Sequence, residues 1–260
     1  MLTRLKDAVA GMATATYDPA MQPDPADRPS DPGSAVIIGT GALGSALADA
    51  LRSRYGRVFE LGRRSEPALD LTQEATVAAA AAWLASQCEA AGSPLRLIVV
   101  ASGFLHGPAG QPERSWQALN LDYLMHSFLI NAAGPALVMK HFLPLLPRQG
   151  PCRAVFLSAK VGSVGDNQLG GWYGYRAAKA ALNQLVKTAS IELARRNRQG
   201  AIIALHPGTV DSPLSAPFSK SGLDVRSPPV AAAQITQVIE ALGPGDNGRF
   251  LDYRGQGLPW

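Results

Sequence analysis

Two side chains of this sequence, Tyr175 and Lys179, have the types and the spacing that proton transfer requires. They are four residues apart in a segment rich in helix formers, and residues i and i+4 of a helix lie side by side on one face. The pKa of a free tyrosine is about 10. A nearby cation favours the phenolate and lowers this pKa, so a neighbouring lysine makes the tyrosine a usable acid or base. The same helical face continues with apolar residues at Leu182, Val186, Ala189 and Leu193. The pair is therefore predicted to point inward.

The Tyr-x-x-x-Lys spacing also occurs by chance in many helices, where the lysine extends to solvent and the tyrosine packs. A lysine on a buried face, however, loses solvation free energy unless something engages its charge. That cost favours a chemical role, provided that the rest of the chain supplies a site for a cofactor or substrate.

A glycine-rich turn supplies the first part of such a site. It follows an apolar segment at 35–38, which is predicted to be a buried strand, and it opens a predicted helix. In this context the G-x-G-x-x-G pattern indicates dinucleotide binding, because small residues let the backbone approach a pyrophosphate at the helix N-terminus. The residues of the turn are Gly39, Thr40, Gly41, Ala42, Leu43 and Gly44.

The end of the next predicted strand, 57–61, falls about twenty residues later, where an adenosine ribose is normally contacted. It runs into Gly62, Arg63 and Arg64, and arginine at this place favours the 2′-phosphate of NADP(H). Glu60 leaves NAD(H) as the alternative, because an acidic residue here would bind the ribose hydroxyls. An ordinary solvated turn is the third interpretation of the two arginines.

Strands and helices alternate along the rest of the chain. Further strands are predicted at 68–71, 95–101, 154–158, 201–205 and 249–253, and helices at 73–90, 113–146 (with a break considered near Asn120), around Tyr175, and at 228–242. This alternation is typical of an α/β fold with a doubly wound, mostly parallel sheet of the Rossmann type. Residues 34–260 form one predicted domain, preceded by an extension, 1–33, with a short amphipathic helix and a tether rich in proline and aspartate.

Composition excludes several classes of protein. The 260 residues are 47% hydrophobic and 17% charged, which argues against disorder. The net charge of +4 comes from scattered residues, and the dense cluster at 195–198 suits a helix C-terminus, so no nucleic-acid partner is expected. Cys88, Cys152 and the four histidines have no metal-ligand spacing, and no metal site is predicted. No apolar run reaches the roughly 18 residues of a membrane span and no secretory signal is recognised, so no membrane partner and a cytoplasmic location are expected.

Together these features resemble the short-chain dehydrogenase/reductase family over residues 34–260. Tyr175 and Lys179 match the family's catalytic pair, Ser158 lies where its catalytic serine is usually found, and Asn131 matches the helix asparagine of its proton relay. The segments 158–167, 170–176 and 255–260 are similar, more narrowly, to the branch of C-factor and sniffer-like carbonyl reductases.

The resemblance implies roles for these residues. Tyr175 would donate a proton to a carbonyl oxygen, Lys179 would lower the pKa of Tyr175 and hold the nicotinamide ribose, Ser158 would hydrogen-bond the carbonyl, and Asn131 would hold a water that reloads the proton. Cofactor-binding roles are implied for the glycine turn and for Arg63, Arg64, Asp70, Ala101, Ser102, Gly103, Tyr175, Lys179, Pro207, Gly208 and Val210.

Three departures from the family pattern bear on these roles. Ala42 stands at the middle glycine of a turn that is one residue shorter than usual, and 100–103 lacks the family's Asn-Asn-Ala-Gly motif. Ala159 holds the place of the second serine, which is normally the catalytic one. Either Ser158 or Ser163 therefore supplies the hydroxyl, or the Tyr/Lys pair works with less help.

The sequence thus predicts an NADP(H)-dependent oxidoreductase that reduces a small-molecule carbonyl, or oxidises the matching alcohol, in a pocket formed by 104–107, 162–172 and 215–227. A nucleotide-binding regulator of the C-factor type is the alternative. An unrelated Rossmann protein, such as a methyltransferase, would not need the inward Tyr175 and Lys179. The resemblance and the apolar residues of 116–146 further predict a homodimer or homotetramer, packed through that segment and 178–193.

Overall fold

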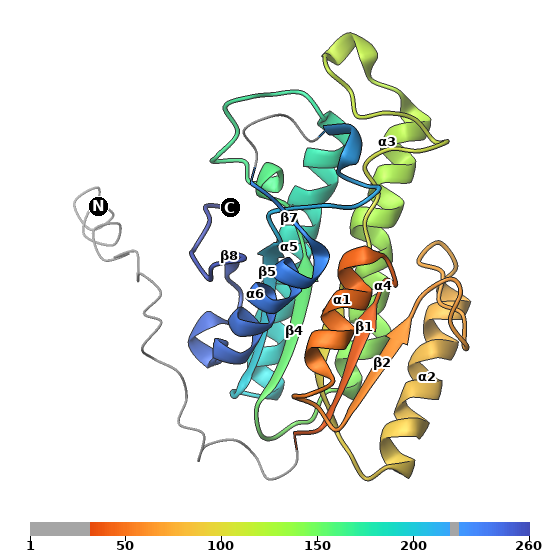
Figure 1. Ribbon diagram of the computed structural model, residues 1–260, viewed down its shortest axis with the longest axis vertical. Coiled ribbons are helices and arrows are strands. Elements are labelled where there is room, and N and C mark those ends of the chain that lie inside the picture. Colours follow the sequence, from red (N-terminus) through yellow and green to blue (C-terminus); the bar gives the residue numbers. More distant parts are fainter. Residues whose placement is uncertain (1–31, 219–223) are drawn as a thin grey trace, which may run out of the picture.

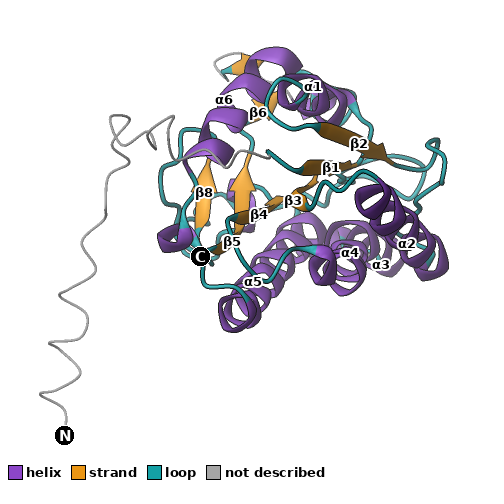
Figure 2. Cartoon of the chain, turned by 90° about the horizontal axis from the view of Figure 1, so that it is seen from below, coloured by secondary structure: helices purple, strands orange, loops and turns teal. Residues whose placement is uncertain are grey.

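Six parallel strands form one sheet between two layers of helices in the computed structural model, which describes residues 32–218 and 224–260 (Figures 1 and 2). The sheet order is β2-β1-β3-β4-β5-β8, and all neighbouring strands pair in parallel. The strands are β1 (Ser34–Ile38), β2 (Arg57–Leu61), β3 (Leu95–Val100), β4 (Cys152–Leu157), β5 (Gly200–His206) and β8 (Phe250–Asp252). The predicted helix and tether of the N-terminal extension lie outside the described residues, apart from its last two positions.

Helices cover both faces of this sheet, which confirms the doubly wound fold. Figure 2 shows α1 and α6 on one face, and α2, α3, α4 and α5 on the other. The helices are α1 (Ala42–Leu51), α2 (Glu74–Ala90), α3 (Leu121–Phe128), α4 (Gly134–Phe142), α5 (Tyr173–Arg196) and α6 (Pro228–Ala241). A π-helical turn, Leu129–Ala133, joins α3 to α4, and a separate parallel pair is formed by β6 (Thr209–Val210) and β7 (Val225–Arg226).

Most strand residues are apolar because helices cover both faces of the sheet. Side chains alternate along a strand, so in β1 Ala35 and Ile37 belong to the core beneath α1 and α6, whereas Val36 and Ile38 belong to the core on the opposite face. All four are at most 1% exposed.

The helical stretch predicted at 113–146 begins later than expected. The predicted helix is broken at Asn120, as the sequence suggested, and α3 begins at the next residue. The Asn120 Oδ1 accepts the Tyr123 backbone N–H at 2.9 Å and so caps α3. The helical run Leu121–Leu145 has the length and mean hydropathy (1.3) of a membrane span. The core helix of a globular domain passes the same test, and Val138 and Phe142 are fully buried against the sheet, so this is weak evidence for a membrane.

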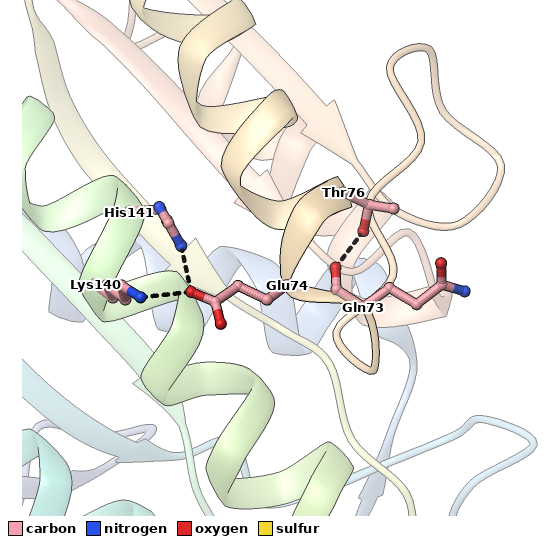
Figure 3. A network of polar contacts seen from close by, with 5 residues as sticks. All are labelled: Gln73, Glu74, Thr76, Lys140 and His141. Atoms are coloured by element: carbon pink, nitrogen blue, oxygen red, sulfur yellow. Dashed lines mark hydrogen bonds and ion pairs between the residues drawn. The ribbon is translucent and has the colours of Figure 1, made fainter.

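A polar network joins α2 to α4 at the N-terminus of α2 (Figure 3). Glu74 accepts hydrogen bonds from Lys140 Nζ at 2.6 Å and His141 Nε2 at 3.0 Å, and Thr76 Oγ1 donates to the Gln73 carbonyl at 2.8 Å. The hydrogen bond from Lys140, followed by that from His141, lowers the pKa of Glu74. Because the network is exposed to solvent, it orients the two helices more than it stabilises them.

The strand predicted at 68–71 is wrong. Leu69 and Leu71 are buried, as their apolar character suggests, but the backbone is held by local bonds instead of a neighbouring strand. Leu69 N–H donates to the Gly62 carbonyl at 2.8 Å, and Asp70 N–H donates to Thr76 Oγ1 at 2.9 Å. The sheet order β2-β1-β3-β4 reverses direction between β1 and β3. In such sheets, the crevice for a ligand is expected beyond the carboxyl ends of the strands at this point.

Candidate active site

The glycine turn after β1 lies against the loop after β3. Gly39 has φ +111°, and a Cβ added to it would lie 2.8 Å from the Ser102 backbone nitrogen; a Cβ on Gly44 would lie 1.8 Å from the Gly39 carbonyl oxygen. A Cβ on Gly41, by contrast, would meet nothing within 4 Å. Gly41 is the N-cap of α1 and no side chain caps that helix, so this open side fits the pyrophosphate of a dinucleotide. The buried Ser102 Oγ, which has no partner in the described structure, supplies a free polar group beside the turn.

The turn after β2 packs onto the glycine turn. A Cβ on Gly62 would lie 2.9 Å from Thr40 Oγ1, and Ser65 Oγ accepts the Gly62 N–H at 2.9 Å. This geometry brings Arg63 and Arg64 beside the glycine turn, where both are exposed. Neither guanidinium makes a hydrogen bond or ion pair within residues 32–218 and 224–260, so both are available to an anionic ligand.

Two acidic residues near this subsite are engaged within the chain. Glu60 Oε1 lies 2.7 Å from Arg52 Nη2, which follows α1. Asp70 Oδ1 accepts hydrogen bonds from the Thr72 N–H at 2.9 Å and Oγ1 at 2.8 Å, and the backbone bond is the main cause that lowers the pKa of Asp70. Ala101 continues the pairing of β3 with β1, since its N–H donates to the Ile38 carbonyl at 2.7 Å.

Tyr175 and Lys179 point inward from α5, as their spacing predicts. Tyr175 is 7% exposed and Lys179 3%, and Lys179 Nζ lies 5.8 Å from the centroid of the Tyr175 ring. The ammonium donates to the Leu157 carbonyl at the end of β4 at 2.9 Å.

The pKa values of this pair differ from the expectation. Burial lowers the pKa of Lys179 to about 8, and burial raises the pKa of Tyr175 instead of the lysine lowering it. Desolvation dominates because both side chains are almost completely buried. Tyr175 is consequently a neutral phenol, the form that can donate a proton.

The hydroxyls of the two serine candidates are hydrogen-bonded to groups other than Tyr175. Ser158 Oγ donates to Asn183 Oδ1 at 2.6 Å, whereas Ala159 belongs to the apolar cluster around Tyr175. Ser163 Oγ is bound to the carbonyl of the C-terminal Trp260 at 3.3 Å. The structure records no hydrogen bond from either hydroxyl to Tyr175, and the choice between them stays a prediction.

Asn183 was missed in the sequence. It follows Lys179 by one further helical turn, so the spacing i, i+4, i+8 could have placed it on the same buried face as Tyr175 and Lys179.

Asn131 lies in the π-helical turn and is fully buried. Its Nδ2 donates to the Phe104 carbonyl at 2.8 Å, and its Oδ1 accepts the Phe104 N–H at 3.0 Å. The amide therefore ties the loop after β3 to the helix, and it makes no recorded hydrogen bond to Lys179. Its predicted role in holding a water stays a prediction.

Glu113 is a second residue that the sequence did not reveal. It is 3% exposed, its backbone carbonyl accepts the Trp172 N–H at 2.5 Å, and its carboxylate accepts the Gly174 N–H at 3.0 and 3.2 Å. Trp172, the N-cap of α5, has φ +54° and makes no side-chain cap. Glu113 thus caps the helix from a distant loop and fixes the turn immediately before Tyr175.

An apolar wall surrounds the Tyr175 phenol. The Trp172 ring centroid lies 6.2 Å from that of Tyr175 and 5.1 Å from that of Phe218. The members of this cluster are Leu105, Ala159, Tyr175, Val161, Trp172, Leu214 and Phe218. All except Ala159 and Tyr175 lie in or next to the three segments predicted to form the pocket. Residues 219–223 of the third segment lie outside the described residues.

The segment after β5 completes the site. Gly208 has φ +72°, and Thr209–Val210 forms β6, which pairs with β7. The Pro207 carbonyl accepts a hydrogen bond from Arg226 Nη2 at 2.7 Å. Within the described ranges, no group of three or more His, Cys, Asp or Glu residues is arranged to hold a metal ion.

Comparison with known proteins agrees with this architecture. C-signal of Myxococcus xanthus is 39% identical over 150 residues, which are 56% of this chain and 85% of that protein. The structure of carbonyl reductase Sniffer of D. melanogaster superposes with a TM-score of 0.76 at 23% identity, covering 88% of this chain and 99% of the other. An NADPH-bound carbonyl reductase from chicken fatty liver gives a TM-score of 0.75 at 22% identity, with 87% and 94% covered. At such identities the two structures establish the fold alone.

The family described as short chain dehydrogenase matches residues 34–222, well over half of the chain. Its match spans the glycine turn, the Tyr175/Lys179 helix and the Pro207–Gly208 segment. The chain therefore belongs to the short-chain dehydrogenase/reductase family of NAD(P)-dependent oxidoreductases.

Proposed function

We propose that this protein reduces a carbonyl group with NADPH. The observation that carries the proposal is the neutral, buried Tyr175 phenol, held one helical turn from Lys179 and surrounded by an apolar wall. A neutral phenol in a water-poor site suits proton donation to a carbonyl oxygen better than proton abstraction from an alcohol. The carbonyl reductase titles of Sniffer and the chicken enzyme support the same substrate class.

Each residue has a defined task in this proposal. The bound cofactor supplies a hydride to the carbonyl carbon. Tyr175 orients the carbonyl oxygen and gives it a proton, and Lys179 holds the nicotinamide ribose while its charge favours the phenolate that remains. Asn183 fixes the Ser158 hydroxyl, and Glu113 fixes the start of α5, so that the phenol stays aimed at the crevice.

The cofactor is proposed to be NADP(H) rather than NAD(H). Arg63 and Arg64 are exposed beside the glycine turn and free of ion pairs with the described residues, so either can bind a 2′-phosphate. Glu60, the residue that would favour NAD(H), is neutralised by Arg52. The NADPH named in the chicken structure's title supports the same choice.

The decisive experiment compares Tyr175→Phe with Tyr173→Phe across a panel of aldehydes, ketones and quinones with NADPH. Tyr175→Phe should lose about 10²–10⁴-fold in kcat while NADPH binding, measured by calorimetry, stays within about twofold. Tyr173 lies two residues away on the same helix and is the matched control, which should keep full activity. Retention of activity by Tyr175→Phe on any accepted substrate would refute the proposed chemistry.

The cofactor assignment has its own test. Dissociation constants for NADPH and NADH are compared in the parent protein and in Arg63→Ala, Arg64→Ala and Glu60→Ala. NADPH should bind more tightly, and loss of an arginine should weaken NADPH binding while leaving NADH binding nearly unchanged. Equal affinities in the parent, or a preference for NADH that Glu60→Ala removes, contradicts the assignment.

A nucleotide-binding regulator is the second candidate function, because 85% of C-signal aligns with this chain at 39% identity. Ala159, which stands where the family often has a second serine after β4, agrees with weakened catalysis. A regulator would produce a biological effect that survives Tyr175→Phe, whereas an enzyme's effect would be lost with that hydroxyl.

We also propose a homodimer or homotetramer in the cytoplasm. Leu121 and Met125 on α3 are 71% and 65% exposed, and Ile191 on α5 is 50% exposed, so the two predicted interface helices present large apolar side chains. Val138 and Phe142, by contrast, are buried in the domain core and are not part of that surface. Light scattering that detects only monomer at micromolar concentration would contradict the assembly.

A further inference from the structure

Arg226 is a buried cation that the proposed chemistry leaves without a role. It ends β7 and is 7% exposed. Its Nη2 donates to the Pro207 carbonyl at 2.7 Å, its Nη1 donates to Gln234 Oε1 of α6 at 2.6 Å, and its guanidinium carbon lies 3.5 Å from the centroid of the Tyr253 ring. The guanidinium is therefore fixed on several sides.

The same guanidinium lies directly behind the segment that follows β5. A Cβ added to Gly208 would lie 1.6 Å from Arg226 Nη2, so only a glycine fits at this contact. The Arg226 carbonyl also accepts the Asp211 N–H at 2.8 Å, which holds β7 against the same segment. Arg226 thus packs directly against Pro207 and Gly208 and holds this segment in place.

The charge of Arg226 is not neutralised locally. No carboxylate of the described residues forms an ion pair with it, and its Nε is buried without a partner. Lys160 and the partly buried His206 lie in the same surroundings. Two acidic residues are also near: Asp252, with its Oδ1 bound to the Arg254 and Gln256 N–H groups, and the exposed Asp211, whose N–H is bound to the Arg226 carbonyl. A buried cation without a counter-ion acts strongly on any charge nearby, because solvent screens it poorly.

We propose that Arg226 fixes the segment 207–210 beside the nicotinamide and makes the protein bind the reduced cofactor more tightly than the oxidised one. The inference rests on the proposed function, in which Pro207, Gly208 and Val210 face the nicotinamide. The oxidised ring carries a positive charge and the reduced ring is neutral, while the phosphates are the same in both states. Arg226 attracts the phosphates equally in the two states, so its effect on the ratio of the two affinities comes from repulsion of the oxidised ring. That repulsion favours loading of the reduced cofactor and release of the oxidised one. By linkage, it makes loss of hydride from the bound cofactor less favourable.

The test measures dissociation constants of the full-length protein for NADP⁺ and NADPH by calorimetry, without substrate. Arg226→Met removes the charge and keeps an unbranched side chain that can cover Tyr253, and Arg226→Lys keeps the charge. The ratio Kd(NADP⁺)/Kd(NADPH) should fall about threefold to tenfold in Arg226→Met and stay near the parent value in Arg226→Lys. A residue with a purely structural role would change both constants by the same factor and leave the ratio unchanged.

Arg153 provides the matched control. It donates to two backbone carbonyls, those of Leu242 at 3.0 Å and Glu240 at 3.3 Å, from the opposite end of β4 relative to the site. Arg153→Met should leave the ratio unchanged.

Three results would overturn the inference: an unchanged ratio in Arg226→Met, an equal fall of the ratio in Arg226→Lys, or equal affinities for NADP⁺ and NADPH in the parent. The last result is decisive even if Arg226→Met does not fold. Failure of the parent to bind either cofactor would instead refute the proposed function.

Discussion

Replacing Lys179 by methionine should make the protein more stable while it abolishes the proposed carbonyl reduction. Burial lowers the pKa of Lys179 from 10.5 to about 8, which corresponds to about 3 kcal/mol of folding free energy lost when the ammonium is buried at neutral pH. Its one recorded hydrogen bond, to the Leu157 carbonyl, returns about 1 kcal/mol. Lys179→Met should therefore raise the free energy of unfolding by about 2 kcal/mol and the Tm by about 4–8 °C.

Urea unfolding of the cofactor-free protein between pH 6 and about 11 measures this difference. The lysine is destabilising below its folded pKa of about 8, where it is charged in both states. The effect declines as pH rises from about 8 to 10.5 and is absent above 10.5, where the lysine is neutral in both states. The advantage of Lys179→Met should consequently vanish over that interval. Lys187→Met, at an exposed position of the same helix, should change stability by less than about 0.5 kcal/mol. A Lys179→Met protein that is less stable than the parent at pH 7 would show that the ammonium is engaged in a stabilising contact, and the reasoning would fail.

Three further predictions concern the turn, the cap and acid stability. Gly44→Ala should destabilise the fold and abolish cofactor binding, because its Cβ would lie 1.8 Å from a backbone oxygen. Gly41→Ala should cost about 1 kcal/mol or less of the free energy of unfolding, measured by thermal unfolding, yet weaken NADPH binding in calorimetry. Glu113→Ala should cost about 2–3 kcal/mol in urea unfolding and lower kcat more than NADPH affinity, since it uncaps α5. Glu192→Ala, at an exposed position of the same helix, should do neither. A Glu113→Ala protein with parental kcat would contradict the capping role. His206 has its pKa lowered to about 4, chiefly by burial, so stability should fall by up to about 3 kcal/mol as pH decreases from 6.5 towards 4, and His206→Gln should flatten that dependence in unfolding experiments at several pH values.

Features that depend on local spacing could be predicted from the sequence. The inward direction of Tyr175 and Lys179 follows from one helical period, and the glycine turn follows from its position between a strand and a helix. The strand at 68–71 could not be excluded in this way, because Leu69 and Leu71 are buried as strand residues would be. What prevents a strand there is a backbone bond from Leu69 to Gly62, which no periodicity encodes.

Features that join distant segments were not predictable from one sequence. Glu113 caps a helix that begins sixty residues later, and Arg226 meets Pro207 and Gly208 only because β7 pairs with β6. The pKa of Tyr175 was predicted with the wrong direction, because the spacing gives the neighbouring charge but not the extent of burial. Ser158 faces Asn183 for a similar reason: the direction of a side chain just beyond a strand depends on how the chain turns there.

The position of Trp172 gives the protein a built-in optical reporter. Its ring lies within the apolar wall beside Tyr175 and Phe218, whereas the other three tryptophans are placed elsewhere: Trp83 packs on Phe59, Trp116 is 70% exposed, and Trp260 stacks on Phe250. The emission of an indole depends on the polarity and the absorbing groups around it. Occupation of the crevice should therefore change the fluorescence of Trp172 far more than that of the other three, so that ligand binding can be followed in the unlabelled protein.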